Sequence, residues 1–136
     1  MKIEKIAREK TALFSDLANK LVYDQEELSS FLGTPFSVEA FEKQMQLKKE
    51  NFSNANRGVL AQVLETNYSI TNTSDFQKRN LEALKRENTF TVTTGHQLSL
   101  FTGPLYFVIK ILHVVQLAES LSKKYPDSHF VPIFWM

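Results

Sequence analysis

The spacing of hydrophobic and polar positions divides the chain into two parts near residue 88. Up to about Glu87, apolar residues recur at helical spacing, and the polar segments between them contain residues that can cap a helix. The pattern predicts five helices, at residues 15–22, 24–32, 37–49, 54–65 and 74–86. Ser15 or Asp16, Asp24, Ser37, Asn54, and Ser74 or Asp75 are the expected capping residues. We interpret this part as amphipathic helices on a core, with a helical protein-interaction module as the alternative.

Beyond residue 88 the pattern becomes that of a strand followed by a long helix. Residues 89–94 are almost all β-branched or aromatic, and a glycine ends the run. Residues 104–124 are so apolar that only a narrow polar row remains, at a spacing of three or four. This segment is long enough to cross a bilayer, but Lys110 would cost roughly 3 kcal/mol near the centre. We therefore predict a buried crossover helix, with Pro104 in its first turn and Thr102 or Gly103 near its cap.

A second strand is predicted at the end of the chain. Residues 129–136, HFVPIFWM, form a nearly continuous apolar run typical of a strand covered on both faces. Pro132 should lie near the strand's start or face an open edge, because it cannot donate a ladder hydrogen bond. The fold class is therefore α/β: a helical region at 1–88, then a parallel, right-handed β-α-β unit at 89–136. Because two parallel strands are not a stable sheet, we expect a truncated part of a larger protein with an exposed sheet edge.

The composition of the chain limits the classes of partner and site that it can have. The 136 residues, 43% of them hydrophobic, match the length and apolar content of one globular domain. A net charge of +1 provides no global field for nucleic acid or an anionic membrane, so we expect neither as a partner. Because there is no cysteine, the chain has no disulfide, thiolate metal site or cysteine nucleophile. The charged start MKIEKIAREK leads into no apolar signal region, which favours a cytoplasmic location.

The loop between the first predicted strand and the long helix is the best candidate for a binding site. In open α/β sheets, ligands bind beyond the carboxyl ends of the strands, and a helix N-terminus there attracts phosphate or carboxylate groups. The candidate binding residues are Thr94, Gly95, His96, Gln97, Thr102, Gly103, Pro104 and Lys110. His96 is also the candidate catalytic residue. The loop has neither the P-loop nor the GxGxxG pattern, so its glycines could equally be ordinary turn glycines and His96 an ordinary loop histidine.

The remaining histidines and the tryptophan are interpreted as structural. His113 lies on the narrow polar row of the long helix, and His129 lies at a strand start. Because no carboxylate stands at ligand spacing from these side chains, we predict no metal site. Trp135 is expected in the core.

Several motifs, in order, resemble a known family. They are Thr94-Gly95-His96-Gln97, the run Phe101 to Tyr106 (FTGPLY), Ile109-Lys110 and the run Val131 to Trp135 (VPIFW). This combination resembles the bacillithiol biosynthesis cysteine-adding enzymes, which are regarded as cysteine ligases. The similarity covers the whole chain, with most of its weight on residues 89–136.

The resemblance implies a Rossmann-like core, related to the nucleotidyltransferase and class I aminoacyl-tRNA synthetase folds, with a coiled coil further along the protein. It implies a ligase that adds cysteine to glucosaminyl-malate, for which ATP or a related nucleotide is a possible cofactor by analogy. The full-length form could be a homo-oligomer. Gly95-His96-Gln97 is similar to the superfamily motif that holds nucleotide phosphates. The family's acidic motif after the second strand is absent here, so we expect binding-site fragments without activity. Another nucleotide-binding enzyme with the same core is an alternative.

Overall fold

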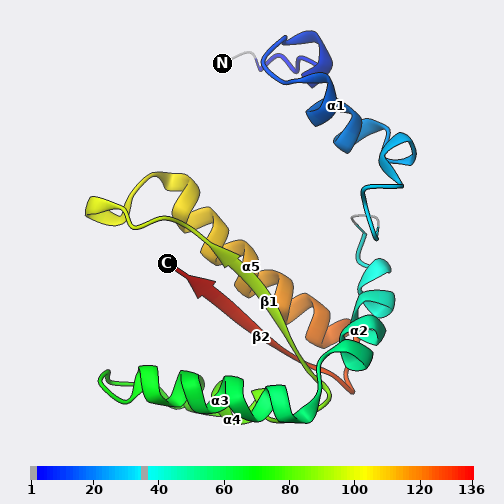
Figure 1. Cartoon of the computed structure of the whole chain (residues 1–136). Coiled ribbons are helices and arrows are strands. Elements are labelled where there is room, and N and C mark those ends of the chain that lie inside the picture. Colours follow the sequence, from blue (N-terminus) through cyan, green and yellow to red (C-terminus); the bar gives the residue numbers. More distant parts are fainter. Residues whose placement is uncertain (1–2, 35–36) are drawn as a thin grey trace. The chain divides into compact units, whose positions relative to one another are not determined.

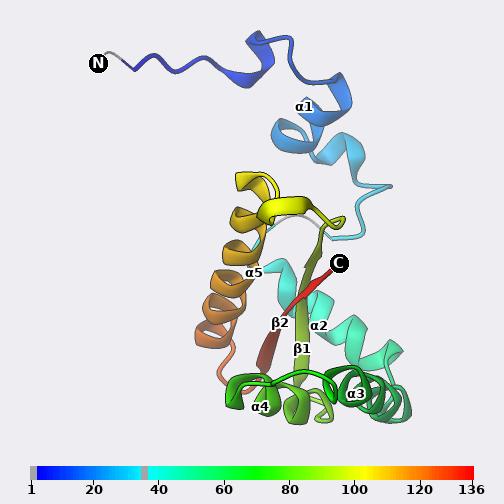
Figure 2. The same ribbon diagram turned by 90° about the vertical axis from the view of Figure 1, so that its left-hand side faces the viewer.

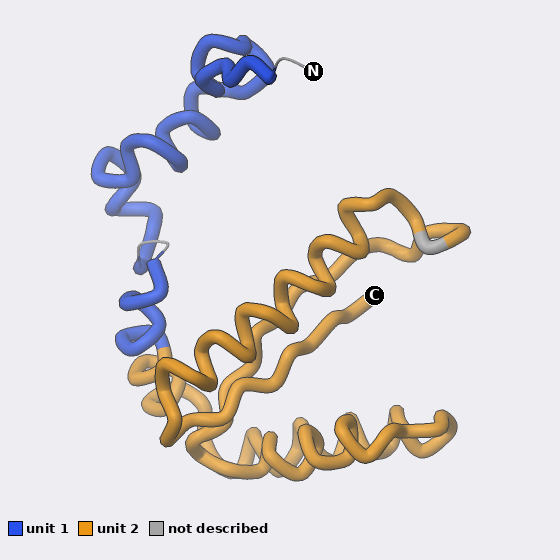
Figure 3. The backbone as a smooth tube through the Cα atoms, turned by 180° about the vertical axis from the view of Figure 1, so that it is seen from behind, with its two compact units in different colours: residues 1–44 blue, residues 45–136 orange. Residues whose placement is uncertain are grey.

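The computed structural model describes residues 3–34 and 37–136, which form two compact units. The units are residues 1–44 and 45–136 (Figure 3). The change from helices to a β-α-β unit occurs at residue 89, where the first strand begins. The compact units divide elsewhere, after Gln44, so the last two helices before the first strand belong to the same unit as the strands.

In its described residues, the unit at residues 1–44 contains the helix α1 (Asp16–Tyr23), two 3₁₀ turns, η1 (Arg8–Lys10) and η2 (Glu26–Leu28), and the beginning of the next helix. The Ser15 hydroxyl caps α1 by accepting a hydrogen bond from the Ala18 amide at 3.2 Å. The predicted helix at 24–32 is wrong, because only η2 forms there. A segment this short needs tertiary packing to remain helical, and Phe31 is 86% exposed.

Three more helices lie between α1 and the first strand in the described residues: α2 (Ala40–Asn51), α3 (Asn54–Tyr68) and α4 (Asp75–Leu84). The hydroxyl of Ser37 accepts from the first amide of α2. Ser53, rather than the predicted Asn54, caps α3. Ser74 caps α4 in a capping box with Gln77, in which each side chain accepts from the other residue's amide. Serine side chains therefore fix where these helices begin.

α3 packs against α4, and exposed charges link their outer surfaces. The Lys85 ammonium lies 2.9 Å from carboxylate oxygens of both Glu65 and Glu82. Hydrogen bonds to Glu65 and then Glu82 raise the pKa of Lys85 above its ordinary value. Because these side chains are largely exposed, the ion pairs contribute little to stability.

The predicted β-α-β unit is confirmed: β1 (Thr89–Gly95), α5 (Leu105–Lys124) and β2 (His129–Trp135) follow in order. The strands pair in parallel, from Thr89 opposite His129 to Gly95 opposite Trp135. Figures 1 and 2 show α5 running back alongside the two strands. The parallel register brings the carboxyl ends of both strands to the same edge, beside the loop that begins α5.

Alternate residues of β2 face different helices. Phe134 meets Phe107 of α5 with 5.0 Å between ring centroids, and Phe130 meets Tyr125 at the end of α5. Val131 joins the buried cluster with Ala83 and Leu84 at the end of α4, against which Ile133 and Leu64 also pack. The sheet therefore lies between α5 on one face and α4 on the other, as the apolar run of β2 predicts.

α5 is a crossover helix, but it is buried on one side only. Val114, Ala118 and Leu121 are buried against the strands, whereas Leu105, Val108, Ile109, Leu112 and Val115 are exposed. The prediction of a buried helix is thus wrong for its outer face, because within the described residues α5 packs on a sheet of two strands. By length and composition alone α5 could cross a membrane. Its packing on both strands is that of a crossover helix in an α/β unit.

The direction of the backbone groups shows which strand edges are open. The amide of His129 donates to Asn88 O, and that of His96 donates to Trp135 O. Because backbone groups alternate sides along a strand, Pro132 faces the edge of β2 away from β1. Its missing N–H therefore removes no hydrogen bond between the two strands, which confirms the edge-facing alternative. The carbonyl groups of Thr89 and Gly95 face the open edge of β1.

Arg57 of α3 donates a hydrogen bond to the first of these two carbonyl groups, that of Thr89. Its side chain is 5% exposed and donates to Thr89 O at 2.9 Å, to Glu87 O at 3.2 Å and to Leu84 O at 3.5 Å. One guanidinium therefore satisfies three carbonyls at the junction between α4 and β1. This contact ties α3 to the start of the sheet.

Arg57→Leu should lower the free energy of unfolding by about 3 kcal/mol, because it leaves three carbonyl groups without their charged donor. Urea denaturation followed by circular dichroism measures the change. Arg79→Leu, at an exposed position of α4, is the matched control and should change the free energy by less than about 0.5 kcal/mol. Equal effects of the two substitutions would show that Arg57 is not a structural clamp.

Candidate functional site

The loop between β1 and α5 has an unusual backbone at two positions. It contains the 3₁₀ turn η3 (Leu100–Thr102), within which Phe101 has φ 52°. Gly103 follows with φ 67° and ψ −163°. A side chain at Gly103 would be strained by this conformation, and its Cβ would lie 2.8 Å from the Cβ of Ser99. Gly103 is therefore required for this loop to turn into α5.

Gly95 is required for a different reason. A Cβ atom placed there would lie 2.5 Å from Cε2 and 2.7 Å from Nε1 of the Trp135 indole. Glycine lets this ring lie directly against the end of β1. The expectation that Trp135 belongs to the core is wrong for the described chain, because its side chain is 64% exposed. It instead covers the strand end beside the loop.

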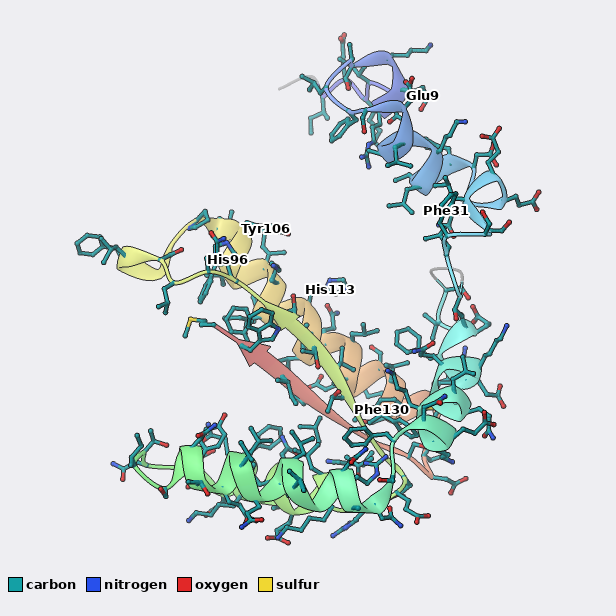
Figure 4. The ribbon with its side chains drawn as sticks, in the orientation of Figure 1. Glu9, Phe31, His96, Tyr106, His113 and Phe130 are labelled. Atoms are coloured by element: carbon teal, nitrogen blue, oxygen red, sulfur yellow. The ribbon has the colours of Figure 1, made fainter. Side chains whose placement is uncertain are left out.

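His96 is held by both its backbone and its side chain. Its amide donates to Trp135 O at 3.2 Å, and its Nδ1 lies 2.7 Å from Gln97 O. The ring meets Tyr106 and Phe107 of α5 edge-on, at centroid distances of 6.2 and 5.6 Å. Figure 4 shows His96 and Tyr106 together at the start of α5, whereas His113 lies further along the helix. The imidazole thus has a defined orientation at the strand end.

Lys110 reaches back from α5 to the same strand end. Its ammonium donates to Gly95 O, the carbonyl that faces the open edge of β1. It also lies 5.0 Å from the centroid of the Tyr106 ring, within the range of a cation–π interaction. The half-buried ammonium is therefore positioned beside the loop instead of extending into solvent.

Pro104 is the N-cap of α5, so the helix begins one residue later than the prediction that put Pro104 in its first turn and Thr102 or Gly103 near the cap, and among the described side chains no N-cap hydrogen bond forms there. Helix geometry leaves the amide groups of Leu105 and Tyr106 without an intrahelical acceptor. These N–H groups and the positive end of the helix dipole can bind an anionic group. Together with the Lys110 ammonium they make this strand end suitable for a phosphate or carboxylate.

The structure brings some of the predicted site residues together. Gly95, His96 and Lys110 meet at the end of β1, next to the loop that Gly103 and Pro104 join to α5. Thr94 lies within β1 opposite Phe134, and the Gln97 side chain is exposed. The side chain of Thr102 lies outside the described part of the chain.

Sequence reasoning missed the three aromatic residues that support the loop: Tyr106, Phe107 and Trp135. The register of two parallel strands could have placed Trp135 opposite Gly95. In the described residues no cluster of three or more His, Asp or Glu side chains could hold a metal ion. His129 lies near Asn80, with Nε2 3.4 Å from its Oδ1, away from the loop.

Comparisons with known proteins cover the whole chain. Residues 1–136 match the family model described as bacillithiol biosynthesis BshC, N-terminal Rossmann-like domain. Proteins named "Putative cysteine ligase BshC" are similar to the chain: those of Flavobacterium johnsoniae and Christiangramia forsetii are 43% and 42% identical over 96% of it. One from Bacillus mycoides is 29% identical over the full length of this chain. The chain spans 24–25% of the length of these relatives. No solved structure gives a significant match.

Gly95→Ala should displace the Trp135 indole and lower the free energy of unfolding by about 1 kcal/mol, because the new methyl group overlaps the ring. Trp135 is the only tryptophan of the chain, so its fluorescence emission reports the displacement directly. Gly58→Ala in α3, where a Cβ meets nothing within 4 Å, is the control. It should leave the emission unchanged and raise stability by about 0.5–1 kcal/mol. An unchanged emission spectrum in Gly95→Ala would contradict the contact.

Proposed function

The chain belongs to the bacillithiol biosynthesis BshC family, in the region of its N-terminal Rossmann-like domain, and from this premise we propose that it is the N-terminal part of a ligase that joins cysteine to glucosaminyl-malate. The bond formed would be an amide, between the cysteine carboxyl group and the sugar amine. The similarity to relatives named as cysteine ligases supports the ligase class.

The observation that carries the proposal is the set of positive groups at the carboxyl end of β1. The Lys110 ammonium, fixed on Gly95 O, lies beside the N-terminus of α5, whose N-cap residue, Pro104, makes no side-chain cap. Amide formation from a carboxylate concentrates negative charge on oxygen atoms, and fixed donors aimed at those oxygens stabilise it. This part of the chain would bind and orient an anionic group of the substrate or cofactor, so that the amine approaches in a defined geometry.

The same donors fit a nucleotide. Activation of a carboxylate at neutral pH is the chemistry that ATP or a related nucleotide would supply, as the analogy with the nucleotidyltransferase fold suggests. The backbone amides of Leu105 and Tyr106, together with Lys110, would hold its phosphate oxygens. Gly103 would allow the backbone to approach them closely.

Further properties of the whole protein are part of the same proposal. Because the chain spans about a quarter of its relatives, we expect it to bind a substrate group without completing the reaction. The full-length protein would be a cytoplasmic homo-oligomer with a coiled coil outside this region. Neither a membrane nor nucleic acid is proposed as a partner.

A chimera tests the ligase function. Residues 1–136 would replace the matching segment of the Flavobacterium johnsoniae relative, and mass spectrometry would detect cysteinyl product from cysteine and glucosaminyl-malate, with and without ATP. We expect product from the chimera and from the unmodified relative, but none from the 136-residue chain alone. A folded chimera without product, beside an active relative, would contradict the proposal. Product in which another amino acid replaces cysteine would favour a different enzyme on the same core.

Gly103→Ala in the chimera should reduce product formation at least about tenfold, since each 1.4 kcal/mol of lost transition-state stabilisation is a factor of ten. The substitution forces a side chain into a backbone conformation that costs about 1–3 kcal/mol and against Ser99, so the loop must rearrange. Gly58→Ala is the matched control, and circular dichroism checks that both variants are folded. Full activity in Gly103→Ala would remove the loop from the site.

A further inference from the structure

The contact of His96 with its own loop fixes which ring nitrogen carries the proton. Nδ1 lies 2.7 Å from the carbonyl oxygen of Gln97. A carbonyl oxygen can only accept a hydrogen bond, so Nδ1 must be the donor. In the neutral ring the proton is therefore on Nδ1, and Nε2 carries a lone pair. Nε2 of neutral His96 can accept a hydrogen bond but cannot donate one.

The ring is also prevented from turning over easily. Tyr106 and Phe107 contact it edge-on, and the His96 backbone is anchored to Trp135 O. A flip about the Cβ–Cγ bond would remove the Nδ1 contact with Gln97 O. The protein therefore determines both the tautomer and the orientation of the imidazole.

Lys110 of α5 brings a positive charge to this strand end. Its ammonium has three N–H groups, one of which is used by Gly95 O on the open edge of β1. The remaining two can be directed to a ligand that lies at the strand end. The Tyr106 ring contacts both basic side chains, with its centroid 6.2 Å from the His96 ring centroid and 5.0 Å from Lys110 Nζ.

We propose that the two basic side chains at this strand end, His96 and Lys110, bind different groups of one ligand. Lys110 holds its anionic oxygens, whereas Nε2 of neutral His96 accepts a hydrogen bond from its amino group. The ligand class is a small carboxylate or phosphate that also carries an amine. This assignment rests on the proposed function, because cysteine and glucosaminyl-malate both belong to that class, and it gives His96 a positioning role in place of a phosphate-clamping one.

The tautomer can be measured without any ligand or activity. Long-range ¹H–¹⁵N correlation spectra of the ¹⁵N-labelled chain above the titration range distinguish a protonated Nδ1 from a protonated Nε2 in each histidine. We expect a protonated Nδ1 in His96. His129 is an internal contrast, because its Nε2 faces Asn80 Oδ1 and should carry the proton. A neutral His96 with its proton on Nε2 would overturn the proposal even if the chimera is an active ligase.

Ligand pairs and conservative variants test the division of roles. Binding of cysteine is compared by calorimetry with that of 3-mercaptopropionate, which lacks the amino group, and glucosaminyl-malate with its N-acetyl form. For a pair that binds, His96→Leu should weaken binding of the amine-bearing ligand about tenfold, because a factor of ten in Kd corresponds to one well-made polar contact. Binding of the ligand without the free amine should weaken less than about twofold. His96→Gln, whose amide oxygen can accept but cannot act as a base, should restore most of the affinity.

Lys110→Met should weaken both members of a pair about equally, because both carry the anionic group, with Lys110→Arg as the conservative control. Equal weakening of both members by His96→Leu, or failure of His96→Gln to restore affinity, would contradict the acceptor role. If no member of either pair binds to the chain or to the active chimera, the ligand class is wrong. Product formation by the chimera is measured separately. Failure of all four ligands to bind would therefore not contradict the proposed ligase function.

Discussion

Parallel pairing of β1 and β2 is the constraint on which the rest of this structure depends. Parallel strands cannot be joined by a tight turn, so a crossover such as α5 must carry the chain back along the sheet. The same pairing places Gly95 beside Trp135 and directs the loop and the start of α5 to one edge. The candidate site is therefore a consequence of strand direction as much as of the loop's own residues.

Two cationic side chains donate hydrogen bonds to backbone carbonyl groups on the open edge of β1. Arg57 donates to the carbonyl of Thr89 at the start of the strand, and Lys110 donates to that of Gly95 at its end. Unpaired carbonyls at a sheet edge are costly when they are buried and invite non-specific pairing when they are exposed. Arg57 thereby links the helices to the sheet, whereas Lys110 links the sheet to the proposed binding loop. The carbonyl groups of the strand edge are thus satisfied by a structural residue at one end and by a predicted binding residue at the other.

Packing on two faces explains why β2 is so apolar and α5 only partly buried. Phe130 and Phe134 face α5, while Val131 faces the end of α4. A strand between two helical layers needs apolar residues at every position, whereas a helix outside the sheet needs them on one side. The additional apolar residues on the outer side of α5 therefore need a covering that the described residues do not provide.

The sequence by itself determined the elements of residues 37–136. Periodicity, capping serines and β-branched runs have local physical causes, so the strands, the long helix and three preceding helices were predicted to within a few residues. The family was also recognisable from short motifs. The predicted helix at 24–32 failed because its stability would have required packing that local pattern cannot show.

Tertiary structure alone decided how the site is built. The closeness of Trp135 to Gly95 depends on strand register, and the hydrogen bond from Lys110 to Gly95 O depends on the path of α5 along the sheet. The orientation of His96 requires Tyr106 and Phe107 to arrive from the next element. These contacts join residues 10 to 40 positions apart in the sequence, and only the folded chain brings such residues within reach of one another.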